Sequence, residues 1–211
     1  MMKTSLSIVV TYNPDANIMK SFYEEVARFS NQRETLIELI VVNNLCPENE
    51  ILDCHFFGEY ITIKKLSSNI EAGQAGSIIL GFMQACSDLI LSIDPDMVSS
   101  LNAIDHMLEF ADQGYQVVVA RRSLRDRPIW RAVSTYFFNI FASFVLGFRV
   151  HDLNSPMFLV RKRVVSELST LELPSEAYKL KLFIDYRARM AEIPVRDYSS
   201  KTSAVSTYRL D

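Results

Sequence analysis

Residues 89–96 read LILSIDPD, an apolar run that is closed by two aspartates on either side of a proline. The run Leu89 to Ile93 predicts a buried strand, because it is apolar apart from one serine and carries no charge. Asp94, Pro95 and Asp96 favour a turn, so we expect the strand to end there. Two earlier stretches of the chain have the same form, and this recurrence decides the fold class.

The rest of the chain alternates between strand and helix patterns with short links. Further strands are predicted at Ser5 to Tyr12, Leu36 to Val42, Ile61 to Leu66 and Gln116 to Ala120. Helices are predicted at roughly Asn17 to Ser30, Ala72 to Cys86 and Leu101 to Ala111. This alternation predicts the α/β class, with a mostly parallel central sheet and helices on both faces. After about Arg121 the pattern is less regular, and we expect an elaboration of the sheet there.

Composition limits the classes of function. The chain has 211 residues, which suits one domain with a single core, and its formal net charge is −3. Nucleic-acid binders usually carry a basic excess, so we expect no nucleic-acid partner and only local recognition of phosphate. The three cysteines, Cys46, Cys54 and Cys86, lack zinc or redox spacing and are expected to be reduced.

The apolar stretches are short. Leu6 to Val10 is too short for the hydrophobic region of a signal peptide. The longest stretch, Tyr136 to Phe148, falls short of the roughly 20 residues that span a bilayer. We therefore expect a cytoplasmic protein without a membrane-spanning helix.

Polar clusters follow three of the predicted strands: Thr11-Tyr12-Asn13, Asn43-Asn44 and Asp94-Pro95-Asp96. Ligands of open α/β sheets bind at the carboxyl ends of the strands. Asp94 and Asp96 can direct their carboxylates to one point if the loop turns sharply, and Pro95 restricts that loop. Such oxygen ligands suit Mg²⁺ or Mn²⁺ that also binds diphosphate and water, and the cation would neutralise a departing diphosphate. The tripeptide alone fits equally well a turn that caps the next helix.

In this order the motifs resemble the family 2 glycosyltransferases of the GT-A type, a nucleotide-diphospho-sugar transferase fold. The resemblance rests on the three clusters and on Asn69 with Gly73, Ala75 and Gly81-Phe82, Ala120-Arg121-Arg122-Ser123, and His151 to Phe158. It covers about Ser5 to Arg163 and is strongest to the dolichyl-phosphate mannosyltransferase and polyprenyl-phosphate glycosyltransferase branch. It implies one domain over residues 1–211, with a nucleotide-binding part at about 1–120 and an acceptor-binding part at about 121–211.

The resemblance also implies roles for individual residues. The nucleotide-sugar site, for a UDP- or GDP-linked donor, would comprise Thr11, Tyr12, Asn13, Asn43, Asn44, Asn69, Gly73 and Asp94. Within it, Tyr12 and Asn13 would lie beside the nucleoside, with the Asn43-Asn44 pair beside its base or ribose. The metal would be held by Asp94 and Asp96. The catalytic residues would be Arg121 and Arg131, which meet donor or acceptor phosphate, and Asp152, which lies near the acceptor.

Some positions depart from the family pattern. Asn43-Asn44 stands where acidic residues are usual, although an amide oxygen also accepts a hydrogen bond from a base N–H. Pro156 stands where a glycine is usual, and the apolar Met97 and Val98 follow Asp96. A relative that binds nucleotide without turnover is therefore kept as an alternative function.

A basic segment and an apolar helix follow one another in the second half. The arginines between residues 121 and 131 are Arg121, Arg122, Arg125, Arg127 and Arg131. Arginine side chains bind phosphate oxygens well, so this segment would bind phosphate. The alternative is a solvated loop with ordinary surface charge. Apolar residues then recur at helical spacing: Trp130, Val133, Phe137, Ile140, Phe141, Phe144 and Phe148. A helix at about 129–148 with this stripe would make peripheral contact with an anionic membrane, or else be a core helix or a homodimer interface.

The acceptor determines the role of Asp152. A polyprenyl phosphate is already anionic, with a second pKa of about 6, and needs orientation more than a base. A hydroxyl acceptor must lose a proton, and Asp152 would then be the general base. We expect a metal-dependent transfer to a polyprenyl (dolichyl-type) phosphate at the inner face of the cell membrane, and the family resemblance implies that the transfer is inverting. The alternative acceptor is a glycan, through a hydroxyl of a cell-surface polysaccharide.

Overall fold

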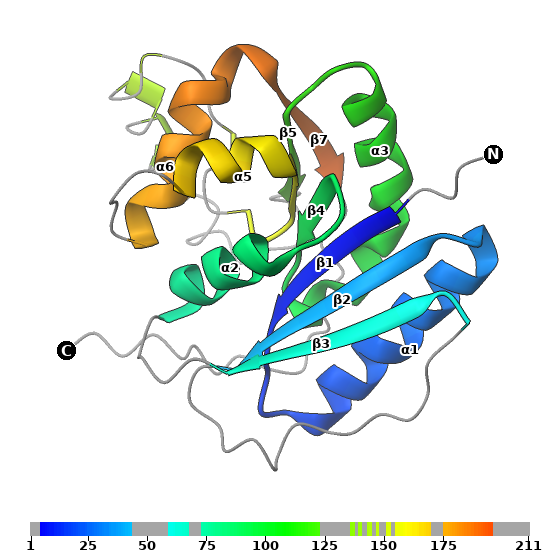
Figure 1. The fold of residues 1–211 in the computed structure, drawn as a ribbon. Coiled ribbons are helices and arrows are strands. Elements are labelled where there is room, and N and C mark those ends of the chain that lie inside the picture. The colour runs from blue at the N-terminus through cyan, green and yellow to red at the C-terminus, as the bar shows by residue number, and fades with distance from the viewer. Residues whose placement is uncertain are drawn as a thin grey trace.

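The computed structural model describes residues 5–43, 59–67, 73–122, 136–137, 139–140, 143–144, 147, 151–152, 155–169 and 175–195. Within these residues a seven-stranded sheet has the order β3-β2-β1-β4-β6-β5-β7 (Figure 1). The strands are β1 (Ser5–Thr11), β2 (Leu36–Asn43), β3 (Ile61–Ser67), β4 (Leu89–Ser92), β5 (Val117–Arg122), β6 (Phe158–Arg161) and β7 (Met190–Val195). All neighbouring pairs in the sheet are parallel except the two that involve β6. The predicted mostly parallel sheet is confirmed.

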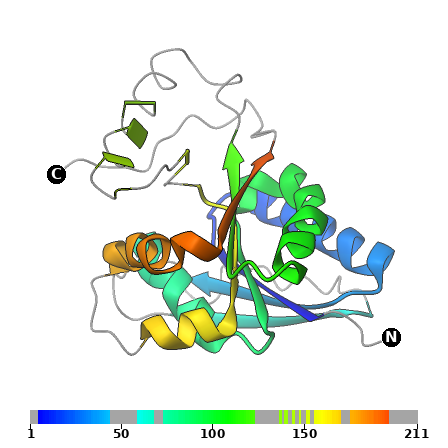
Figure 2. The same cartoon turned by 90° about the horizontal axis from the view of Figure 1, so that it is seen from above.

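Helices cover both faces of this sheet (Figure 2). One face packs against α1 (Ala16–Arg33), the 3-10 helix η2 (Pro95–Ala103) and α3 (Ile104–Asp112). The other face packs against α2 (Gly73–Gln84), α5 (Lys162–Ser169) and α6 (Ser175–Tyr186), and a short 3-10 helix, η4 (Arg187–Arg189), leads into β7. Successive strand residues point to opposite faces, so Ile8 and Val10 lie in the first core and Val9 lies in the second.

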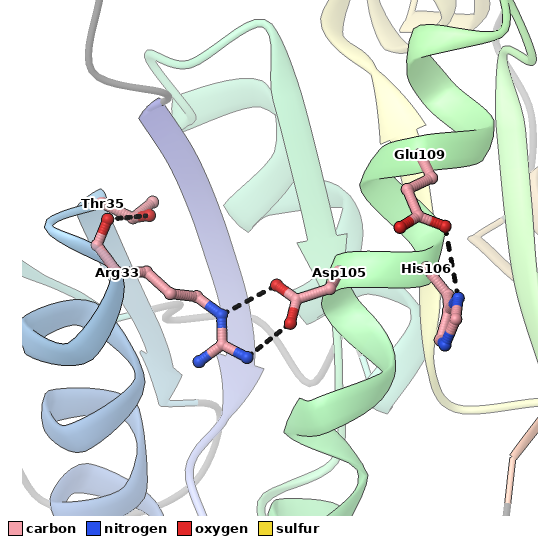
Figure 3. Close-up of polar contacts among 5 residues, drawn as sticks. All are labelled: Arg33, Thr35, Asp105, His106 and Glu109. Atoms are coloured by element: carbon pink, nitrogen blue, oxygen red, sulfur yellow. Dashed lines mark hydrogen bonds and ion pairs between the residues drawn. The ribbon is translucent and has the colours of Figure 1, made fainter.

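The first helical layer is fixed at its ends by polar contacts. Asp15 caps α1 by accepting a 2.9 Å hydrogen bond from the backbone N–H of Asn17. At the other end Arg33 forms a bidentate ion pair with Asp105 of α3, in which Nε lies 2.8 Å from Oδ1 (Figure 3). The hydrogen bond to Asp105 raises the pKa of Arg33. This pair ties α1 to α3 across the same face of the sheet.

In the second layer α2 packs closely against the sheet at Gly81. A Cβ atom added there would lie 2.3 Å from Cγ1 of Val9 and 3.3 Å from Cγ2 of Val42. Only glycine fits at such a separation without a shift of the helix or of β1. Gly81 therefore sets how closely α2 approaches β1 and β2.

The described part of the chain after β5 adds two strands to the sheet, besides the helices α5 and α6 that cover one face of it. Strand β6 is inserted between β4 and β5 and runs antiparallel to both, with Phe158 paired to Ser92 on one side and to Val119 on the other. The expected elaboration after Arg121 thus includes β6 and the edge strand β7. Because β6 is antiparallel, its first residue lies at the edge of the sheet where the parallel strands end.

Candidate active site

The edge at which β1, β2, β4 and β5 end, here called the carboxyl edge, collects the polar clusters. Thr11 ends β1, Asn43 ends β2, and Asp94 follows β4 by two residues. The backbone N–H of Ile93 still bonds to Val9 O at 3.2 Å, so Asp94 leaves the sheet beside the end of β1. The predicted grouping of these residues at one edge is confirmed.

Asp94 is held by α2. It occupies the N-cap position of η2, with φ −78° and ψ 142°, but its side chain makes no capping hydrogen bond. Its Oδ1 instead accepts a 2.7 Å hydrogen bond from Nε2 of Gln74, in the first turn of α2. The interpretation of Asp94 as a simple helix cap is therefore not supported, because its carboxylate turns toward α2.

Asp96 lies in the first turn of η2 and its side chain is exposed, between the buried residues Pro95 and Met97. Across the described ranges no group of three or more His, Cys, Asp or Glu residues is arranged to hold a metal ion. The chain thus offers the two carboxylates of Asp94 and Asp96 on one short loop. Two carboxylates fit Mg²⁺ or Mn²⁺, which are often bound by one or two protein carboxylates together with substrate phosphates and water.

Four of the predicted nucleotide-side residues, Thr11, Tyr12, Asn13 and Asn43, lie around the ends of β1 and β2. The backbone N–H of Tyr12 donates a 2.9 Å hydrogen bond to Val42 O, which extends the pairing of the two strands. Asn43 is buried, with 2% exposure. The Oδ1 atom of Asn13 accepts a 2.9 Å hydrogen bond from the Asp15 N–H and so shapes the start of α1. Gly73 begins α2, whereas Asn44 and Asn69 lie outside the described residues.

Arg121 stands near the end of β5 on the other side of β6. Ser92 and Val119 both pair with Phe158, and Asp94 and Arg121 each follow by two residues. Asp94 and Arg121 therefore flank the chain on its two sides where it enters β6. Arg131 lies outside the described residues.

Asp152 reaches the same edge just before β6 and is 5% exposed. Its carbonyl accepts a 3.2 Å hydrogen bond from the Ser155 N–H, and the Ser155 hydroxyl donates to Ala120 O of β5 at 2.5 Å. The carboxylate of Glu192, on β7, accepts hydrogen bonds from the backbone N–H groups of His151 and Asp152 at 3.1 and 3.4 Å.

Sequence reasoning missed Gln74 and Glu192. Gln74 directly follows Gly73, in the motif that also contains Asn69, Ala75 and Gly81-Phe82, but the resemblance assigns no role to it. Glu192 is the one charged residue in the sequence Met-Ala-Glu-Ile-Pro-Val of β7, and a charge in an apolar strand was the available signal.

The apolar stripe is exposed where the structure describes it. Residues 136–137, 139–140 and 143–144 are helical. The stripe residues Phe137, Ile140 and Phe144 are 64%, 49% and 85% exposed, which contradicts the core-helix alternative for these three side chains, and the neighbouring Tyr136 is 57% exposed. Asn139 is buried and its Nδ2 donates a 2.5 Å hydrogen bond to His151 O. Trp130, Val133, Phe141 and Phe148 lie outside the described part of the chain.

Among the described helices, none combines the length and hydropathy needed to cross a bilayer.

Comparison with known proteins agrees with this arrangement. Residues 7–169 match the sequence profile of the glycosyl transferase family 2. The undecaprenyl-phosphate 4-deoxy-4-formamido-L-arabinose transferase of Pseudomonas paraeruginosa is 25% identical over 162 residues, which is 76% of this chain and 48% of the relative. The transferase of the same name from Pectobacterium atrosepticum is 28% identical over 100 residues, 47% of this chain and 31% of the relative. The chain thus spans about half or less of the length of these relatives.

Solved structures share the fold. The glucosyl-3-phosphoglycerate synthase of Mycobacterium tuberculosis in complex with UDP superposes with a TM-score of 0.65 and 14% identity, over 96% of this chain and 74% of that one. The mannosyl-3-phosphoglycerate synthase of Rubrobacter xylanophilus gives a TM-score of 0.61 and 12% identity, over 92% of this chain and 66% of that one. The predicted GT-A type fold is confirmed.

Proposed function

Because the chain belongs to the family 2 glycosyltransferases, we propose that it transfers a sugar, with inversion, from a UDP- or GDP-linked donor to a polyprenyl phosphate. The observation that carries the proposal is the position of Asp94 and Asp96 at the carboxyl edge, with the Asp94 carboxylate fixed by Gln74. Ligands of open α/β sheets bind at this edge, and a carboxylate pair there suits a metal diphosphate.

The metal in this proposal is Mg²⁺ or Mn²⁺, held by Asp94 and Asp96. A solved structure of the Mycobacterium tuberculosis synthase in the same fold contains Mn²⁺ together with UDP-glucose, which supports the choice. When bound, the cation supplies positive charge to the leaving diphosphate. The nucleoside would lie over the ends of β1 and β2, near Tyr12, Asn13 and Asn43, so that residues of about 1–120 bind the donor.

The acceptor would bind on the other side of β6, to residues of about 121–211. Arg121 lies there and supplies a guanidinium for phosphate. The relatives named above are undecaprenyl-phosphate 4-deoxy-4-formamido-L-arabinose transferases, which favours a polyprenyl phosphate over a glycan. The exposed residues Phe137 and Phe144 favour peripheral contact of the segment at about 129–148 with the inner face of the cell membrane.

Asp152 would orient the acceptor rather than act as its base. A phosphate acceptor attacks as an anion, so charge compensation and positioning are the main requirements. With a polysaccharide hydroxyl as acceptor the same carboxylate would have to remove a proton. The second candidate function, transfer to such a hydroxyl, therefore differs in what Asp152 does.

In the test, purified protein is incubated with Mn²⁺ and with UDP- or GDP-sugars that carry a label on the sugar. The acceptor is either a short polyprenyl phosphate or polysaccharide oligomers. Labelled lipid, formed by the wild-type chain and not by folded Asp96→Ala protein, is the expected result. Label in the oligomers alone would overturn the proposed acceptor. Nucleotide binding without any transfer would support the non-catalytic alternative.

A further inference from the structure

Glu192 places a carboxylate inside an otherwise apolar strand. It pairs with Val119 of β5 in the parallel register, and its side chain is only 13% exposed. A carboxylate at such a site is costly unless hydrogen-bond donors satisfy it. Here the Oε1 atom accepts from the backbone N–H groups of both His151 and Asp152, and the Oε2 atom contacts Nδ1 of the His151 ring. The partners of Glu192 thus belong to Asp152, whose carboxylate we propose to orient the acceptor, and to the residue before it, His151.

The same two residues are held from other directions as well. Asn139, itself a buried residue, donates from its side chain to the carbonyl of His151 at 2.5 Å. Ser155 donates from its backbone N–H to the carbonyl of Asp152 at 3.2 Å. The segment is therefore fixed by its carbonyls as well as by its N–H groups, and Glu192 holds it from β7.

Glu192 also lies close in register to Arg121. Val119 is the β5 partner of Glu192, and Arg121 follows Val119 by two residues. Residues two apart on a strand share a face, so Arg121 and Glu192 are on the same face of the sheet. Glu192 therefore lies on β7, the strand next to Arg121, and also holds Asp152, so the position of Asp152 relative to Arg121 depends on Glu192.

We propose that Glu192 is a positioning residue that fixes the backbone of His151 and Asp152, and through it sets the Asp152 carboxylate against the acceptor. This inference rests on the proposed function and adds a residue to it. A displacement of about 1 Å at a reacting group lowers rate by about 100-fold. Loss of the Glu192 acceptor should thus reduce turnover without changing how the nucleotide binds.

The variants separate hydrogen bonding from charge. Glu192→Gln keeps an oxygen that accepts both N–H bonds, whereas Glu192→Met removes it at similar size. Glu192→Asp keeps the charge but withdraws the acceptor by one methylene, and it replaces Glu192→Met if that variant does not fold. The matched control is Glu109→Met, because Glu109 forms a similar pair with His106 at 3.3 Å on the exposed surface of α3 (Figure 3).

Two readouts are measured. Hydrogen exchange at the amides of residues 151 and 152 needs no turnover, and we expect it to accelerate about tenfold or more in Glu192→Met. For transfer to a short polyprenyl phosphate we expect kcat to fall about 10- to 100-fold, with the donor KM changed less than about twofold. Glu192→Gln should stay within about threefold of wild type in both, and Glu109→Met should change neither.

Unchanged exchange in both Glu192→Met and Glu192→Asp would overturn the positioning role, as would an unchanged kcat or an equal loss in Glu192→Gln. If the wild-type chain transfers to no acceptor, the proposed function fails by itself. The exchange measurement then still decides whether Glu192 fixes this segment.

Discussion

The side-chain amide of Gln74 donates a 2.7 Å hydrogen bond to Oδ1 of Asp94, and this contact joins the first turn of α2 to the loop after β4. The bond fixes the rotamer of one of the two carboxylates that we assign to the metal. It also leaves the backbone of η2 without a side-chain cap from Asp94. The geometry of the proposed metal site thus depends on where α2 lies.

Gln74→Ala is expected to lower kcat/KM for the metal-bound donor by about 3- to 30-fold. A hydrogen bond to a charged group contributes about 1.5 to 3 kcal/mol, and this one contributes less because it is partly solvated. Steady-state transfer at varied Mn²⁺ measures the loss. Gln113→Ala, at the exposed end of α3, is the control and should match wild type. Equal kinetics in the two variants would show that Gln74 does not act on Asp94.

Gly81→Ala is expected to destabilise the fold by about 1 to 3 kcal/mol, because the new Cβ overlaps a side chain packed in the core. That side chain belongs to Val9, whose Cγ1 would lie 2.3 Å away. Urea unfolding gives the free energy. A Val9→Ala change makes room, so the double variant should lose less than the sum of the single changes. Strict additivity would mean that the helix shifts instead.

The carboxylate of Glu38 makes the free energy of unfolding depend on pH in the acidic range. Burial acts to raise its pKa, but hydrogen bonds from the Cys86 N–H and the Ser7 hydroxyl, with the charge of Lys64, outweigh burial and leave the pKa lowered. A lowered folded pKa gives stability that is present above the ordinary value of 4.5 and is lost as the pH falls through the folded value. The bonds measure 2.8 Å from Cys86 N and 2.5 Å from Ser7 Oγ.

Glu38→Gln should therefore be less stable than wild type at pH 7, by about 1 to 2 kcal/mol, and the difference should narrow below about pH 4. Urea unfolding at a series of pH values measures both proteins. A gap that is independent of pH would mean that the ionised carboxylate contributes nothing beyond its shape.

Phe144→Glu and Phe137→Glu are expected to weaken binding to anionic phospholipid vesicles about tenfold or more, since burial of one phenyl ring contributes about 1.5 to 3 kcal/mol. Cosedimentation at fixed lipid measures this, and donor binding should not change. Sedimentation equilibrium tests the homodimer alternative on the same samples. Variants that bind vesicles like wild type but dissociate a dimer would assign the exposed stripe to a protein interface.

The sequence predicted elements whose signal is local. The runs before Asn13, Asn43 and Asp94 are mostly apolar and are interrupted only by single polar residues such as Ser7, Glu38 and Ser92, so their strands and common edge followed from pattern alone. Strand β6, Phe158–Arg161, is only four residues long, and its antiparallel pairing with β4 is decided by long-range contacts rather than by the local sequence. The helix predicted near Leu101 to Ala111 is α3 (Ile104–Asp112), whereas the 3-10 helix η2 that precedes it was not predicted. It begins at Pro95, because proline suits the first helical position.

The contacts of the candidate site were harder to predict than its location. The bond between Gln74 and Asp94 requires α2 to lie against β1, which Gly81 and Val9 decide by packing. Glu192 meets His151 only because β7 joins the sheet beside β5. Such long-range contacts leave no periodic pattern in the chain, so motif reasoning found Asp94 and Asp152 but not the residues that hold them.

Calorimetric titration of the protein with UDP and with GDP, with and without Mn²⁺, tests the central assignment most directly. The account predicts that one nucleotide binds only with the cation, and that Asp94→Asn and Asp96→Asn each weaken this binding about tenfold or more while the fold stays intact. Binding of equal strength without the cation, or in both variants, would contradict it.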